Sequence, residues 1–170
     1  MKRSTAPRTV ALALFTCLFT CSASAFTAAE HVQERHLTLT CESYVEWGEQ
    51  RTHVSLPLFR VFDGQGRQIW ELTGYPRNFP ERLEAALELT EPDSSHRSLA
   101  AELQLTVDVQ GRPVQSSPAA DFTFTKYWAD WCKPCHLQTE DLSLFLEHRP
   151  GTQITVLHIE ADLTKLCEDP

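Results

Sequence analysis

Two cysteines separated by two residues, Cys132 and Cys135, are the side chains of this sequence best suited to chemistry. Alternating Phe and Thr from Phe122 predict a strand before them, and the apolar spacing after Cys135 predicts a helix from about Lys133 to His148. At a helix N-terminus the unpaired backbone N–H groups and the helix dipole stabilise a thiolate. We therefore expect Cys132 to attack a disulfide and Cys135, one helical turn later, to resolve the mixed disulfide.

The same residues also fit a second motif, because Cys132–His136 matches the C-x-x-C-H pattern of covalent haem attachment. Haem would need an axial ligand besides His136, and the only methionine is Met1. Met1 lies in a segment that we expect to be removed, so only histidine or open coordination would remain. Pro134 and the tryptophans beside the motif have no role in a haem protein. A c-type haem protein is therefore kept as an alternative.

The segment from Trp128 to Cys135, Trp-Ala-Asp-Trp-Cys-Lys-Pro-Cys, closely resembles the active-site signature of the thioredoxin superfamily. That signature has Trp-Ala, an acidic or small residue, and then Trp-Cys-x-Pro-Cys. The resemblance implies a thiol–disulfide oxidoreductase in which Cys132 is the nucleophile and Cys135 the resolving thiol. Trp128 and Trp131 would form an apolar rim around the sulfurs. The resemblance also implies no dissolved cofactor, a disulfide-containing client protein and an external redox partner.

One position departs from the pattern of that family. The residue six before the first cysteine is commonly a buried aspartate that assists proton transfer to the resolving cysteine, and here it is Lys126. A lysine on a central strand must reach solvent, pair with an acid such as Glu160, or lose its proton. Our hypothesis is that Lys126 favours the thiolate of Cys135 and partly replaces the missing acid.

Residues 54–90 predict the elements that would complete such a domain. Two apolar runs on either side of the turn Asp63–Gly66 predict a β-hairpin. A helix follows the hairpin, with Asn78 as its N-cap and Glu81 completing a capping box.

This hairpin and helix resemble the C-terminal half of a thioredoxin domain, with Leu56-Pro57 before the first strand and Gly74 after the second. In that family the proline is cis and packs against the redox cysteines, and the backbone beside it pairs with the client. The resemblance therefore implies a cis Pro57 that positions the client. The alternative is that Pro57 merely begins an edge strand in trans.

Residues 91–120 predict a polar linker with one accessory strand, because apolar residues alternate from Leu103 to Val109. The cysteine-bearing half, 121–170, comes last, whereas in an ordinary thioredoxin it comes first. We therefore expect a single α/β domain over 26–170, with a thioredoxin-like fold whose central mixed sheet is flanked by helices and whose halves are circularly permuted. A truncated module beside a separate remnant also fits, but neither half has enough apolar residues for its own core.

Cys41 and Cys167 would flank the ends created by such a permutation. A structural disulfide between them would replace the missing chain connection, and an oxidising compartment would permit it. A second redox dithiol and two unpaired thiols are the alternatives. Zinc would normally need a second cysteine pair at close spacing, so we expect no metal site.

The first 25 residues resemble a secretory signal peptide, because basic residues precede an apolar run and Ala23–Ala25 fits a cleavage site. The apolar run is too short to span a bilayer, so we expect no membrane span in the mature chain. Cys21 raises a lipoprotein alternative. Cleavage after Ala25 would leave 12 basic against 23 acidic residues, a balance that argues against nucleic acid as a partner.

These patterns together predict an exported thiol–disulfide oxidoreductase, periplasmic if the source is a bacterium with two membranes. Lys133-Pro134 between the cysteines differs from the Pro-His pair of strongly oxidising relatives, which favours reduction of client disulfides. The alternative outside the enzymes is a redox-inactive thioredoxin-like module that binds a client protein or a metal.

Overall fold

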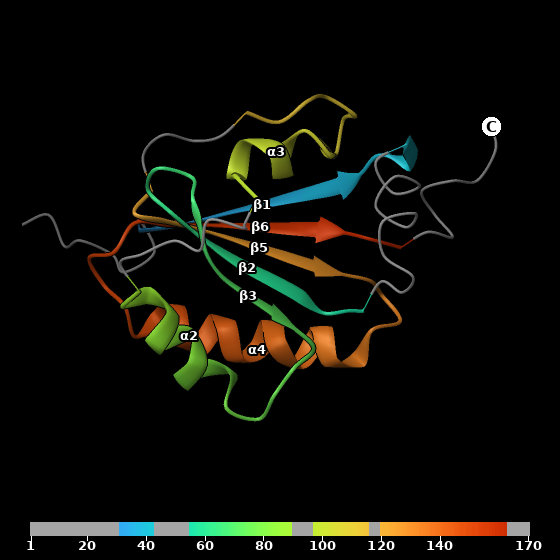
Figure 1. The fold of residues 1–170 in the computed structure, drawn as a ribbon. Helices are drawn as coiled ribbons and strands as arrows, with labels where there is room; N and C mark the ends of the chain where they lie inside the picture. The colour runs from blue at the N-terminus through green and yellow to red at the C-terminus, as the bar shows by residue number, and fades with distance from the viewer. Residues whose placement is uncertain (1–30, 43–54, 90–96, 116–119, 163–170) are drawn as a thin grey trace, which may run out of the picture.

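The chain forms one six-stranded mixed sheet with helices on both faces, seen in a computed structural model (Figure 1). The structure describes residues 31–42, 55–89, 97–115 and 120–162. The α/β class with a central mixed sheet flanked by helices is therefore confirmed. The elements are β1 (Val32–Leu39), β2 (Leu58–Asp63), β3 (Gln68–Thr73), α2 (Phe79–Leu87), α3 (Leu99–Leu103), β4 (Thr106–Asp108), β5 (Phe122–Trp128), α4 (Lys133–Glu147) and β6 (Ile154–Glu160).

The strand order in the sheet is β3-β2-β5-β6-β1-β4, so strands distant in sequence lie side by side. The three central neighbours β5, β6 and β1 run parallel, because helix α4 returns the chain from the end of β5 to the start of β6. β2 pairs antiparallel with β5, β3 with β2, and β4 with β1. The hairpin from the early part of the chain is thus joined directly to the strand that precedes the cysteines.

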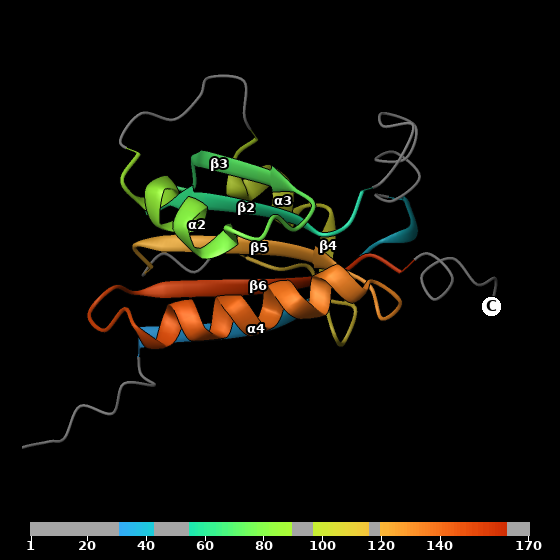
Figure 2. The ribbon, with the colours of Figure 1, turned by 90° about the horizontal axis from the view of Figure 1, so that it is seen from below.

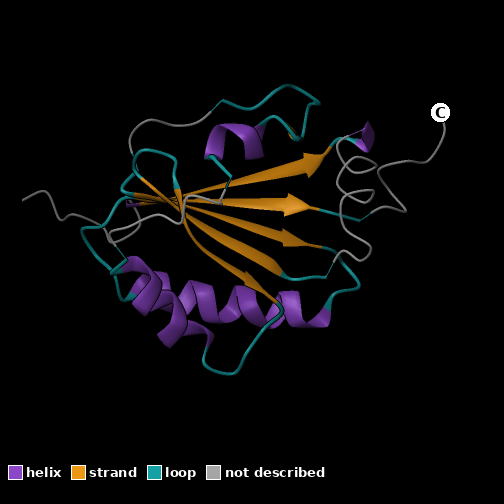
Figure 3. Cartoon of the chain, viewed as in Figure 1, coloured by secondary structure: helices purple, strands orange, loops and turns teal. Residues whose placement is uncertain are grey.

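Helices α2 and α4 cover one face of the sheet, and α3 covers the other (Figures 1 and 2). Figure 3 shows the same layers coloured by element type. Because successive side chains of a strand point to opposite faces, each strand contributes to two separate cores. Under α2 and α4 the buried residues include Phe59, Phe79, Leu83, Phe124, Leu142 and Val156. Under α3 they include Leu37, Phe62, Leu99, Leu103, Tyr127 and Leu157.

The predicted hairpin and the helix after it are present, with one correction at the start of the helix. Asp63 and Gly66 close the turn, where Gly66 has a φ of 74° that suits glycine. Pro80 lies in the first turn of α2. The predicted capping box is wrong, because the Asn78 side chain makes no capping hydrogen bond. Its backbone, with φ −101° and ψ 36°, is not the extended conformation that capping residues adopt.

The predicted accessory strand from Leu103 to Val109 is wrong over most of its length. Ser98 caps the short helix α3 by accepting a hydrogen bond from the Ala101 N–H at 3.2 Å, and Leu103 belongs to that helix. Only Thr106–Asp108 forms a strand, and Val109 is 70 % exposed. A turn follows the strand at Gly111, which has a φ of 75°.

β1 is a strand that the sequence analysis did not predict. It pairs in parallel with β6 over seven residues from Val32 to Thr38. Only Leu37 and Leu39 in it are fully buried, while Glu34 and His36 are exposed. The apolar alternation that would have revealed the strand is therefore confined to one end.

Several expectations lie outside the described residues. These are the signal peptide expected over residues 1–25, the parts 91–96 and 116–119 of the linker expected over 91–120, and Cys167. Cys41 is disulfide-bonded, but its pairing with Cys167 stays a prediction. Within the ranges described above, no helix is long and apolar enough to cross a membrane.

Candidate active site

Cys132 and Cys135 lie at the N-terminus of α4 and are joined by a disulfide with a Cα–Cα distance of 5.3 Å. Cys132 occupies the N-cap, and its Sγ accepts a hydrogen bond from the Cys135 N–H at 3.2 Å. This is the contact that serine or aspartate makes at ordinary caps, where it satisfies a free backbone donor. The same donor would stabilise negative charge on Cys132 when the disulfide is reduced.

The local sequence explains why the helix begins at this point. Pro134 lies in the first turn of α4, where the missing N–H leaves no backbone acceptor unpaired. Before it, the Cys132 N–H donates to the Ala129 carbonyl at 3.0 Å, which turns the chain out of β5. The Ala161 N–H donates to the Trp128 carbonyl at 2.8 Å and ties the ends of β5 and β6 together.

The two cysteines are shielded from solvent, whereas the residues next to Cys132 in the sequence are exposed. Cys132 is 3 % exposed and Cys135 is 1 % exposed, whereas Trp131 is 67 % exposed. Lys133 and Pro134 between the cysteines are also exposed. A partner would therefore approach Cys132 across Trp131 and the first turn of α4.

The structure brings Leu56 and Pro57 to the cysteines. Leu56 packs against the buried cluster of Ala129, Cys132 and Cys135. The Leu56–Pro57 peptide bond is cis, as expected. Pro57 is buried, and its carbonyl accepts a hydrogen bond from the Gly74 N–H at 2.7 Å, which fixes this segment to the end of β3.

Trp128 and Trp131 occupy different places around the sulfurs. Trp128 is half-buried and packs on the cysteine cluster, while Trp131 is the exposed one. The Trp128 ring meets His136 edge to face, with 6.4 Å between ring centroids. A ring nitrogen of His136 lies 3.0 Å from the Asp130 carbonyl oxygen, so this imidazole is held against the loop that carries Trp131.

Lys126 neither reaches solvent nor depends on Glu160 for its charge. Its side chain is 2 % exposed, and its Nζ donates to the Thr139 hydroxyl on α4. That hydroxyl donates in turn to the Cys135 carbonyl at 2.9 Å. Burial lowers the pKa of Lys126 to about 8, against the opposing influence of the Glu34 carboxylate. The lysine is thus connected to the helix turn that holds Cys135.

Thr139, His158 and Glu34 were not singled out by sequence reasoning, although all three belong to the surroundings of Lys126. Thr139 follows Cys135 by one helical turn, so helical spacing could have indicated it. His158 is the direct neighbour of Lys126 in the register of β5 and β6. Only that register, which the sequence does not specify, brings it there.

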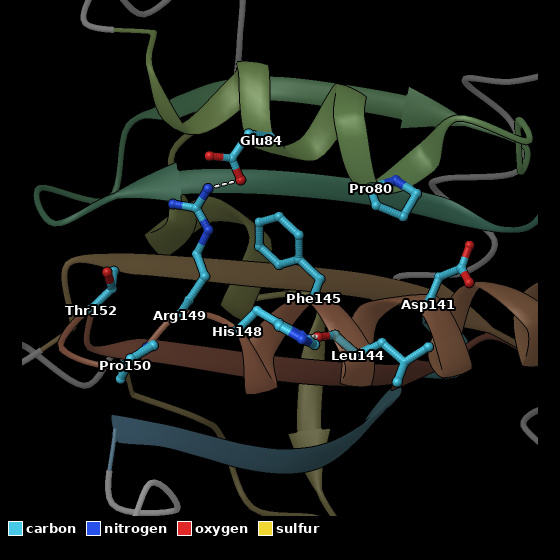
Figure 4. A pocket seen from close by; sticks show the side chains of 9 residues that line it. All are labelled: Pro80, Glu84, Asp141, Leu144, Phe145, His148, Arg149, Pro150 and Thr152. Carbon is cyan, nitrogen blue, oxygen red and sulfur yellow. Dashed lines mark hydrogen bonds and ion pairs between the residues drawn. The ribbon is translucent and has the colours of Figure 1, made fainter.

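An open groove of about 630 Å³ lies at the other end of α4, between that helix and α2 (Figure 4). Arg149 and Glu84 form an ion pair across it. The Arg149 guanidinium also lies 4.9 Å from the ring centroid of Phe145. The groove contains neither cysteine, and its other lining residues are Pro80, Asp141, Leu144, His148, Pro150 and Thr152.

Among the described residues, no group of three or more histidine, cysteine, aspartate or glutamate side chains could hold a metal ion. Comparison with known proteins gives no further guide, because no family model, curated protein or solved structure matches this chain. The function must therefore be argued from the geometry around the cysteines.

Proposed function

We propose that this protein is an exported thiol–disulfide oxidoreductase that reduces disulfides of client proteins through Cys132 and Cys135. One observation carries the proposal. Leu56, next to Pro57 in a distant part of the chain, packs against a Cys-x-x-Cys disulfide at a helix N-terminus. A disulfide serving only stability would need neither the helix N-terminus nor an exposed tryptophan beside it.

The topology supports a permuted thioredoxin-like fold as part of the same proposal. The unit β5-α4-β6 supplies two parallel strands with the cysteines between them. The hairpin β2-β3 lies antiparallel beside β5, and α2 packs on the same face as α4. These are the pieces that the resemblance assigns to the two halves of a thioredoxin domain, in reversed order along the chain.

The reaction would proceed by two exchanges at sulfur. The Cys132 thiolate attacks one sulfur of a client disulfide, which forms a bond between Cys132 and the client and releases the second client sulfur as a thiolate. Cys135 then loses its proton and attacks the Cys132 sulfur. This step forms the Cys132–Cys135 disulfide and releases the first client sulfur. The client gains two electrons, which a thiol redox partner later returns to the protein.

The residues around the sulfurs would each have a different role in the reaction. Trp131, the exposed side chain next to Cys132, would contact the client, and Trp128 would exclude water from beneath the sulfurs. The backbone beside Pro57 would align the client chain. Lys126 is the proton-transfer candidate, and its positive charge would favour the thiolate of Cys135. The Thr139 hydroxyl connects Lys126 to the helix turn that holds Cys135.

The test is catalysis of insulin reduction by dithiothreitol, followed as turbidity. The wild-type protein is expected to shorten the lag, and Cys132→Ser is expected to leave the uncatalysed lag unchanged. Circular dichroism of the variant controls for folding. No acceleration by a folded wild-type protein would instead support a redox-inactive binding module. A covalent haem spectrum after expression with haem-attachment machinery would support the c-type haem alternative.

A further inference from the structure

Three neighbouring strands place three basic side chains in a row across the sheet. In the register of β5, β6 and β1, Lys126 lies directly beside His158, and His158 lies directly beside His36. Residues paired in this way point to the same face of a sheet. Lys126 contacts α4, so the row lies on the face that α4 covers.

The row begins in the core and ends in solvent. The His158 side chain is 9 % exposed, and its Nε2 lies 3.5 Å from a carboxylate oxygen of Glu34. The imidazoles of His158 and His36 are stacked, with 5.0 Å between centroids. Glu34 is 51 % exposed and His36 is also exposed. The row therefore runs from the buried Lys126 to side chains that are exposed to solvent at its other end.

The buried end of the row is attached to the redox helix. Lys126 donates to the Thr139 hydroxyl, which donates to the Cys135 carbonyl. From β2 the residue beside Lys126 is Phe59, which is apolar. On this face of the neighbouring strands, the titratable groups include Glu34 and His36 on β1 and His158 and Glu160 on β6. Helix α4, which covers the face, carries Cys135 in its first turn and has Cys132 as its N-cap.

The buried groups oppose each other's protonation. Burial lowers the pKa of His158, and the positive charge of Lys126 lowers it further, while Glu34 raises it. Burial likewise lowers the pKa of Lys126 to about 8. The amount of positive charge that this pair holds therefore depends on the charges around it.

We propose that Lys126 and His158 form a coupled proton-holding pair that takes up a proton when the Cys132–Cys135 disulfide is reduced. The inference rests on the proposed function and names the groups that regulate it. Reduction places thiolate charge at the start of α4, and Lys126 is joined to that helix through Thr139, one turn after Cys135. By thermodynamic reciprocity, protonation of the pair then stabilises the reduced protein.

The electrons and protons of the reduction balance as follows. A dithiol reductant supplies two electrons, so the S–S bond between Cys132 and Cys135 breaks and one forms in the reductant. The reductant also gives up two protons. One remains on Cys135 as a thiol. The Cys132 sulfur stays a thiolate, so the second proton is shared between the Lys126–His158 pair and the solvent.

The experiment is a pH titration of the imidazole resonances in the full mature chain, oxidised and then reduced with dithiothreitol. The His158 signal, assigned with His158→Gln, is expected to titrate at higher pH in the reduced protein. In the oxidised protein, Lys126→Met is expected to raise the His158 midpoint because the neighbouring positive charge is gone. His148 at the far end of α4 is the internal control.

Arg112→Gln is the matched variant, since it removes a positive charge from the exposed loop after β4. It is expected to leave the His158 midpoint unchanged. Coincident His158 titrations in oxidised and reduced wild-type protein would overturn the proposal, even if Lys126→Met fails to fold. Catalysis is read separately in the insulin assay, so a protein that catalyses without a redox-dependent His158 midpoint would lose this inference and keep its function.

Discussion

At the residue scale, the arrangement of the two sulfurs assigns a different role to each. Cys132 caps α4 and lies next to the exposed Trp131, while Cys135 lies one residue beyond Pro134 in the first turn. We expect Cys135→Ser to accumulate a mixed disulfide between Cys132 and the client, because attack can occur and resolution cannot. Non-reducing gel electrophoresis with a disulfide-containing client measures this adduct.

Cys132→Ser is the matched control for the trapping experiment, because it removes the other sulfur from the same turn. It is expected to give little adduct, since Cys135 is the more deeply placed thiol. If Cys132→Ser trapped the client as efficiently as Cys135→Ser, the assignment of nucleophile and resolving thiol would be reversed.

Lys126 gives a prediction about stability and pH. Burial lowers its pKa in the folded protein to about 8, from 10.5 for a free side chain. Between these values the unfolded chain binds more protons than the folded one, so the free energy of unfolding rises with pH. We expect a rise on the order of 2 kcal/mol in the oxidised protein, measured by urea unfolding between about pH 7 and 10.5.

Lys126→Met is expected to lack this pH-dependent rise, because the variant has no buried amine to deprotonate. Lys133→Met, which removes an exposed lysine from the same helix region, is expected to retain it. A wild-type protein whose stability stayed flat over this interval would show that Lys126 titrates normally.

The redox residues could be predicted from sequence because their spacing and neighbours are contiguous. Cys132, Cys135 and Trp131 all fall within one short segment. The groups that surround Lys126 could not be predicted in the same way. His158 and Glu34 come from two other strands, and the register between strands depends on the whole sheet.

At the element scale, a buried charged cluster joins α3 to the sheet. Glu102 on α3 is fully buried, and one carboxylate oxygen accepts hydrogen bonds from Arg60 of β2 and, at 2.7 Å, from the Tyr127 hydroxyl of β5. Arg60 also donates to Glu71 of β3 at 2.8 Å. Three strands and one short helix are thus connected on the face opposite the cysteine helix.

We expect Glu102→Ala to lower the free energy of unfolding by roughly 3 to 5 kcal/mol, because it leaves the buried Arg60 and Tyr127 without their shared acceptor. Urea denaturation measures the change. Asp108→Asn removes a carboxylate from the surface pair with Arg112 and is expected to leave the free energy of unfolding nearly unchanged. Equal effects of the two substitutions would contradict a special role for the buried cluster.

Helices and strands with a clear apolar pattern in the sequence could be predicted. The short or partly exposed elements at the edge of the sheet could not. The helical spacing of α4 continues to its end, and the helix was predicted to within one residue. The alternation of Phe and Thr at the start of β5 indicated the strand. The apolar residues Leu99 and Leu103 have helical spacing that overlaps an apparent alternation to Val109, which led to the wrong strand. In β1 no residue of the first half is fully buried, so the apolar alternation typical of a strand is missing there.

At the scale of the whole molecule, the sheet order could be predicted only in part. The expectation that the early hairpin lies against the cysteine-bearing half followed from two sets of elements that each lacked a core. The position of β1 outside β6 did not follow from any such argument. Its pairing covers the outer edge of β6 and places His36 at the exposed end of the row that begins at the buried Lys126.

The interdependence of the two parts of the chain can be tested by cutting between them. A protease site inserted at 116–119 would separate β1, β2, β3 and β4 from β5, α4 and β6. Since β5 pairs with β2 and β6 pairs with β1, we expect the cleaved parts to stay together in size-exclusion chromatography under native conditions.

After separation in urea, each part alone is expected to show no cooperative unfolding by circular dichroism. Mixing them after urea removal is expected to restore both the native spectrum and insulin reduction. A separated part that unfolded cooperatively would indicate two independent bodies, because a strand-pairing interface shared between the parts leaves neither with a complete core.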